Sequence, residues 1–277
     1  MNQRVRAITG YLFKSLLFSL AGLLYILVAL AFYYVLFAPG QRTPDGDYYF
    51  LVIGIFGAAL SFLVTLSVSS RANKAEHFPF LVRLPSRVEY LSAVMLAALL
   101  FALLVELAIA LLALVINGPA LGYHDLLVIL PVWLTADLLF VVLALHATDL
   151  VTLGWSRVYV FGILGILLYL QSGNALIKDW LSGAFRDLGS ALLSQGIDGL
   201  SAIAFDISGW LATNGANFLD QLFSIVFWPF SAIANAAVNG SFTLAQALAP
   251  AILLLYATGL FILAASFFAR KDLFLTE

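Results

Sequence analysis

Two acidic residues inside long apolar stretches, Glu106 and Asp137, are the first candidates for chemistry in this sequence. At about 1.5 Å of helical rise per residue, each lies roughly 15–18 Å from the loop at 117–124, so antiparallel neighbours would hold them at similar depth. A charged acid in hydrocarbon costs several kcal/mol, and these stretches contain no Lys or Arg to pair with it. The pair is therefore either a polar or proton-linked lining, or two neutral acids bonded to a helix backbone or to Thr135 and serving only packing.

The composition explains why such acids would be unusual here. Hydrophobic residues make up 63% of the 277 residues and charged residues only 10%, whereas charged residues are about a quarter of a typical soluble domain. The sequence therefore predicts a polytopic membrane protein and no nucleic-acid partner. The absence of cysteine excludes disulfides, thiolate metal sites and a cysteine nucleophile.

The apolar runs predict an all-α fold, a polytopic membrane helix bundle of about six transmembrane helices in one domain over 1–277. The first run is too long for a signal peptide, whose apolar region is about 7–15 residues. The predicted spans are 11–38, 48–69, 89–116, 125–146, 150–170 and 244–268.

Residues 171–241 differ from the spans, because polar residues recur every seven or eight positions between apolar groups. This pattern predicts amphipathic external helices that lie in the membrane interface or line a vestibule. Within this region, 222–241 is either re-entrant or spanning. Five glycines are expected to break the helices into short pieces: Gly183, Gly189, Gly196, Gly199 and Gly209.

A basic segment at 70–90 separates the second and third predicted spans. Clustered Lys and Arg in a short loop mark the cytoplasmic side, which places both termini inside as well. The segment either only orients the protein or also contacts a cytoplasmic partner through its apolar middle. The residues of interest are Arg71, Lys74, His77, Phe78, Phe80, Arg83 and Arg87.

Several catalytic motifs are absent from the sequence. It has no G-x-x-x-x-G-K-[ST] phosphate loop, no H-E-x-x-H zinc pair and no G-x-S-x-G serine motif. We therefore expect no enzyme activity in this chain, and no catalytic, cofactor-binding or metal-binding residue.

The six-span plan, the basic loop leading into LPSRVEYLSAVMLAALL at 84–100, and FFARKDLFLTE at 267–277 together resemble the membrane subunit of an ABC transporter of the type-2 exporter family. The resemblance implies a permease that pairs with a second permease, identical or different. It also implies a separate cytoplasmic ABC ATPase that holds ATP and Mg and acts on a coupling segment at 75–87. The external region, at some seventy residues, is longer than the family pattern.

The expected function is an exporter permease in the plasma membrane that moves an amphipathic or lipid-like substrate by alternating access. The alternative is a non-transporting scaffold or accessory subunit whose external helices at 171–241 bind a partner protein.

Overall fold

The computed structural model describes residues 3–38, 45–74, 77, 84–151, 155–239, 243 and 246–270. Every regular element in these ranges is a helix, which confirms the all-α prediction. The elements are α1 (Gln3–Leu17), α2 (Leu20–Phe37), α3 (Gly46–Ala72), α5 (Arg87–Asn117), α6 (Tyr123–His146), α7 (Trp155–Ser194), α8 (Asp198–Asn239), the 3-10 helix η2 (Gln246–Leu248) and α9 (Ala249–Arg270).

Five of the described helical segments are long and apolar enough to cross a membrane. They are Leu20–Phe37, Gly46–Ala72, Arg87–Asn117, Asp125–His146 and Gln246–Arg270. The chain is therefore a membrane protein. The fifth predicted span, 150–170, falls at the start of α7, where the described apolar section is the shorter Trp155–Ile166, so this crossing stays a prediction.

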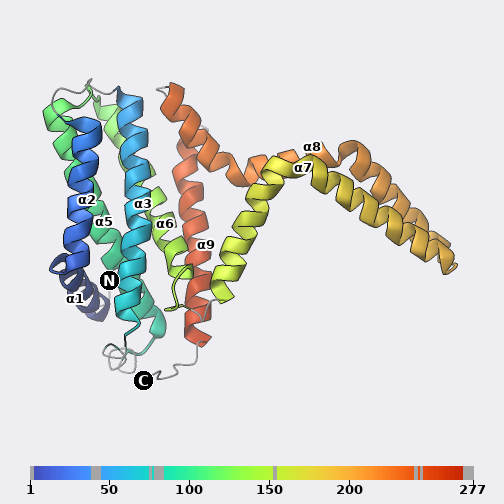
Figure 1. Ribbon diagram of the computed structural model, residues 1–277, viewed down its shortest axis with the longest axis horizontal. Helices are drawn as coiled ribbons and strands as arrows, with labels where there is room; N and C mark the ends of the chain where they lie inside the picture. The colour runs from blue at the N-terminus through green and yellow to red at the C-terminus, as the bar shows by residue number, and fades with distance from the viewer. Residues whose placement is uncertain are drawn as a thin grey trace. The chain divides into compact units, whose positions relative to one another are not determined.

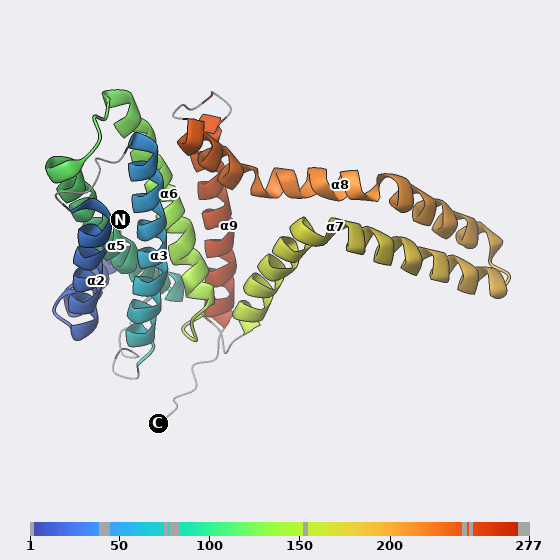
Figure 2. The ribbon, with the colours of Figure 1, turned by 45° about the horizontal axis from the view of Figure 1, so that its top comes forward.

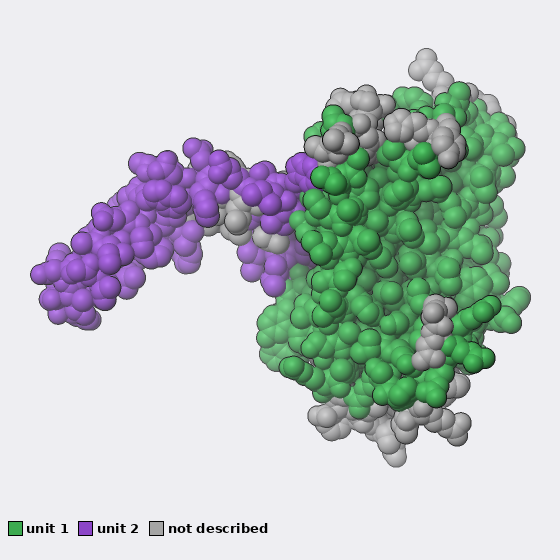
Figure 3. Space-filling view, turned by 180° about the vertical axis from the view of Figure 1, so that it is seen from behind, with its two compact units in different colours: residues 1–160, 229–277 green, residues 161–228 purple. Residues whose placement is uncertain are grey.

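The chain divides into two compact units, residues 1–160 with 229–277 (unit 1) and residues 161–228 (unit 2), coloured separately in Figure 3. Unit 1 is a bundle in which α3 packs against α5 and α6, α6 also packs against α9, and α1 packs against α5 (Figure 1). Its core is aromatic and aliphatic, with Tyr90, Phe101 and Ile53 completely buried.

The first predicted span, 11–38, differs from the structure, in which two helices meet at a corner. Ser19 adopts an extended backbone there, and its hydroxyl accepts from the Gly22 amide at 3.2 Å, as an N-cap does. The same hydroxyl donates to the Leu16 carbonyl at 2.6 Å. Gly22 lies so close to the carbonyls of Leu16 and Leu17 that a Cβ atom would not fit. The apolar run is thus continuous in sequence but turns at Ser19.

Helix α1 is amphipathic and precedes the first membrane helix. Val5, Thr9, Leu12 and Leu16 are buried and recur at three- and four-residue spacing, so they form one face. The Thr9 hydroxyl donates to the Ala93 carbonyl of α5 at 3.4 Å. The basic residues of α1 are Arg4, Arg6 and Lys14, and such a helix is typical of a membrane interface.

Unit 2 is an antiparallel pair formed by α7 and the first part of α8 (Figure 2). The expectation that five glycines break this region is wrong for four of them, because Gly183, Gly189, Gly199 and Gly209 all lie inside long helices. Only Gly196 lies between the helices, with a φ of 75° that favours glycine.

Replacement of Gly22 by Ala should destabilise the corner between α1 and α2. The added Cβ overlaps the Leu16 carbonyl, and overpacking of this kind costs about 1–3 kcal/mol. The matched control is Gly10→Ala in α1, whose Cβ meets nothing within 4 Å and should stabilise the helix by about 0.5–1 kcal/mol. Thermal melting in detergent, followed by tryptophan fluorescence, should lower Tm for the first variant and raise it for the second. Equal Tm values for the two variants would contradict the close contact between Gly22 and the Leu16 carbonyl at this corner.

Candidate functional site

The structure brings Glu106 of α5 and Asp137 of α6 together inside unit 1. Both residues are 0% exposed, and their carboxyl groups lie close to each other. Ser61 of α3 lies beside the Asp137 carboxyl. Gly57, also on α3, contacts the Glu106 carboxyl so closely that any larger residue would overlap it. Three membrane helices therefore enclose the pair.

The carboxyl oxygens are not satisfied by the surrounding protein. Among the described residues, neither the four oxygens of Glu106 and Asp137 nor the Ser61 hydroxyl makes a hydrogen bond of ordinary geometry. If the acids served only packing, Thr135 was predicted as a hydrogen-bond partner for them. The Thr135 hydroxyl instead donates within its own helix, to the carbonyls of Pro131 at 2.8 Å and Val132 at 3.1 Å. Two adjacent carboxyls without a cation cannot both ionise readily in an apolar interior. We therefore expect the pair to hold a proton.

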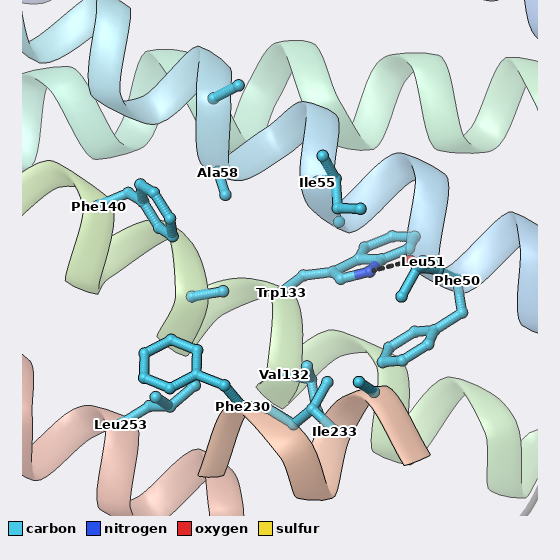
Figure 4. Close-up of a pocket in the computed structure, with 14 residues that line it drawn as sticks. Phe50, Leu51, Ile55, Ala58, Val132, Trp133, Phe140, Phe230, Ile233 and Leu253 are labelled. Carbon is cyan, nitrogen blue, oxygen red and sulfur yellow. Dashed lines mark hydrogen bonds between the residues drawn. The ribbon is translucent and has the colours of Figure 1, made fainter. Parts of the chain in front are cut away.

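An apolar cavity of about 330 Å³ lies in unit 1, between α3, α6, the end of α8 and α9 (Figure 4). Two of its wall residues, Ala58 and Ala136, are the chain neighbours of Gly57 and Asp137. The other lining residues come from α3, α6, the end of α8 and α9: Phe50, Leu51, Gly54, Ile55, Ala59, Val132, Trp133, Phe140, Phe230, Ile233, Ala234 and Leu253.

The cavity wall offers almost no polar group. The one indole N–H, on Trp133, donates to the Phe50 carbonyl at 3.0 Å, as the dashed line in Figure 4 marks. An apolar pocket of this kind can accept apolar ligands. The arrangement suits a hydrocarbon chain.

The basic segment is anchored to other helices at both of its described ends. Arg71, at the end of α3, donates to the Ser15 carbonyl of α1 at 3.0 Å. Arg87, at the start of α5, donates to the Ala269 carbonyl of α9 at 3.5 Å. Lys74 is exposed. Three other residues predicted for this segment, Phe78, Phe80 and Arg83, lie outside the described residues.

His77 belongs to a second cavity at the same end of unit 1. Its side chain is 5% exposed, and its ring centroid lies 5.8 Å from that of Tyr11 in α1. The cavity measures about 440 Å³ and is also lined by Arg4 and Tyr90. The contribution of α1 was missed from the sequence, although the spacing of Val5, Thr9, Leu12 and Leu16 described above is the signal that could have revealed it.

Neither of these regions resembles a metal centre. In the described part of the chain, no group of three or more His, Cys, Asp or Glu side chains is placed to hold a metal ion. No protein-family model, curated protein or solved structure matches the chain.

Replacement of Glu106 by Gln should preserve the fold and remove a protonated carboxyl. Gln keeps the shape of the side chain, so Tm should stay near that of the parent, while the infrared carbonyl band of a protonated carboxyl should weaken at neutral pH. Asp179→Asn is the control, because its side chain is 72% exposed and lies outside the buried pair. If neither Glu106→Gln nor Asp137→Asn changes the band, the pair does not hold the proton.

Two substitutions one helical turn apart in α3 should have opposite effects at the cavity. A Cβ at Gly54 would lie 2.8 Å from the Trp133 indole, so Gly54→Ala should cost about 1–3 kcal/mol through overpacking. Ala58→Leu should extend into the cavity and stabilise by about 0.5–2 kcal/mol, as cavity-filling changes commonly do. Thermal melting measures both. A lower Tm for Ala58→Leu would contradict the open space at that wall.

Proposed function

We propose that the chain is the permease subunit of an ATP-driven ABC exporter of the type-2 family, moving an amphipathic or lipid-like substrate by alternating access. A separate cytoplasmic ABC ATPase, which holds ATP and Mg, supplies the energy. A second permease subunit, identical or different, completes the pathway. Both termini lie in the cytoplasm, and the membrane is the plasma membrane.

The observation that carries this proposal is the attachment of the basic segment to the bundle. Arg71 links the end of α3 to α1 at Ser15, next to the corner that begins α2. Arg87 links the start of α5 to the end of α9 at Ala269. A displacement of the segment between Arg71 and Arg87 would therefore act on all of these helices together. This is the mechanical property that a coupling element needs.

The buried groups of unit 1 support the substrate class. The apolar cavity can accept a hydrocarbon chain, and α3, which contributes to its wall, also carries Arg71. Movement of α3 would change the cavity and the contact between Gly57 and the Glu106 carboxyl at the same time. An apolar chain bound there would thus respond to force applied at the basic end.

The proposal is tested by purifying the tagged full-length chain from cells that produce it, in mild detergent. A subunit with the G-x-x-x-x-G-K-[ST] motif should co-purify, and the complex should hydrolyse ATP. Reversal of Lys74 to Glu should weaken that association in a salt-dependent way, because an exposed charge pair contributes on the order of 1 kcal/mol. Arg71→Glu with Arg87→Glu should also uncouple hydrolysis from transport of a fluorescent lipid.

Arg186→Glu is the matched control, because it makes the same charge change on an exposed residue of unit 2. It should leave both the association and hydrolysis unchanged. Purification that never recovers an ATPase would refute the exporter. Recovery of an external protein through residues 171–241, without an ATPase, would favour the alternative of a non-transporting scaffold.

A further inference from the structure

The two helices of unit 2 meet through small residues. Ser182 of α7 is buried against α8, and its carbonyl accepts from the Ser208 hydroxyl at 2.8 Å. A Cβ at Gly189 would lie 3.0 Å from the Phe205 ring, and one at Gly215 would lie 3.1 Å from Lys178. Small residues allow close helix approach in membrane proteins, where large side chains are not needed inside the seam.

The large apolar side chains of the pair point outward instead. The seam residues recur at three- and four-residue spacing, and on each helix most of the large exposed apolar residues lie on the same rotational side of that seam. Leu193, seven residues after Arg186, is the exception on α7. Because the helices are antiparallel, these two sides form one face of the pair. This apolar face consists of Trp180, Leu188, Leu200, Ile203, Ile207, Trp210, Phe218 and Ile225, which are 37–71% exposed.

Polar side chains occupy the opposite face and its outer edges. Asp179, Arg186, Ser190 and Asp198 are exposed on that face, and further aspartates follow along its edges. Between 178 and 209 the sequence has four aspartates against one lysine and one arginine. The polar face is therefore acidic, so attraction to anionic lipids cannot drive its association with a membrane.

Both ends of the pair continue into apolar helix without an intervening loop. Helix α7 begins with the apolar section Trp155–Ile166, and α8 runs on into Phe223–Ala236. If these two apolar sections enter a bilayer, the helices that continue from them begin at the surface of that bilayer. Trp180 and Trp210 on that face are of the type enriched at membrane interfaces, where one side of a helix is buried in lipid and the other stays in water.

We propose that the pair formed by 178–194 and 198–228 lies in the plane of the membrane, with its apolar face in the interfacial layer of a lipid bilayer. The acidic face is turned to water. Burial of apolar area in zwitterionic lipid is the driving force, and anionic headgroups are not required. The inference does not require that the chain transport anything.

The absence of cysteine in the sequence allows a direct test by single-cysteine spin labelling of the full-length protein. On α7 the matched positions are Leu188→Cys and Ser190→Cys. On α8 they are Ile207→Cys and Gly209→Cys, the latter with nothing within 4 Å of its Cβ. Each pair is two residues apart, which places the labels on opposite sides of the helix. Variants must first reconstitute and melt like the parent protein.

The labelled proteins are reconstituted in phosphatidylcholine vesicles, and paramagnetic accessibility is measured with oxygen, which partitions into lipid, and with a water-soluble nickel chelate. Labels at 188 and 207 should favour oxygen, and labels at 190 and 209 should favour nickel. Equal access of nickel to all four positions would place the apolar face in water and overturn the proposal. If both reagents were excluded from labels at 188 and 207, the apolar face would be covered by protein, such as a second copy of the chain. This result would also overturn the proposal.

Vesicle charge provides the second arm of the experiment. Addition of anionic lipid should leave the oxygen preference at 188 and 207 unchanged or reduce it, because the polar face carries excess negative charge. An oxygen preference that develops only in anionic vesicles would contradict burial of apolar area as the driving force.

Discussion

The close approach of α3 to α5 and α6 is the constraint on which the rest of unit 1 depends. Gly57 leaves room for the Glu106 carboxyl, and Gly54 leaves room for the Trp133 indole, so one face of α3 accepts two large polar-tipped side chains. In hydrocarbon there is no water to satisfy buried polar groups, so each must find a partner in the protein or become neutral. The indole donates to the Phe50 carbonyl, whereas among the described residues the two carboxyls lie beside each other and Ser61 without a hydrogen bond of ordinary geometry.

Much of this architecture follows from the sequence, because apolar runs determine where membrane helices lie. The predicted spans 48–69, 89–116 and 125–146 correspond to α3, α5 and α6 within a few residues at each end. The corner at Ser19 could not be predicted in this way. It interrupts no apolar run, and depends on a hydroxyl cap and on the fit of Gly22 against the Leu16 carbonyl.

The glycines of unit 2 show why local propensity fails where helices touch. A glycine inside a helix costs roughly 0.5–1 kcal/mol relative to alanine, which is why a break at each one was a reasonable expectation. Among these glycines, Gly189 instead lies at the seam, where the absence of a Cβ lets Phe205 approach. Gly215, for which no break was predicted, lies at the same seam against Lys178. The gain in packing is not visible in a single helix. Likewise, the similar depth of Glu106 and Asp137 in the sequence predicts that they can meet. The sequence does not predict that Gly57 leaves the room for the Glu106 carboxyl.

The two membrane helices that bear Arg71 and Arg87 also meet at Glu106, because α5 carries this residue and α3 contacts its carboxyl through Gly57. On α5, Arg87 and Glu106 are separated by about 28 Å of helix, and on α3, Arg71 and Gly57 are separated by about 21 Å. Neither of these stretches contains a proline, the residue at which helices most often kink sharply. A turn of α3 about its axis would replace Gly57 by a larger neighbour, which cannot occupy the space beside the Glu106 carboxyl. That carboxyl would then have to move.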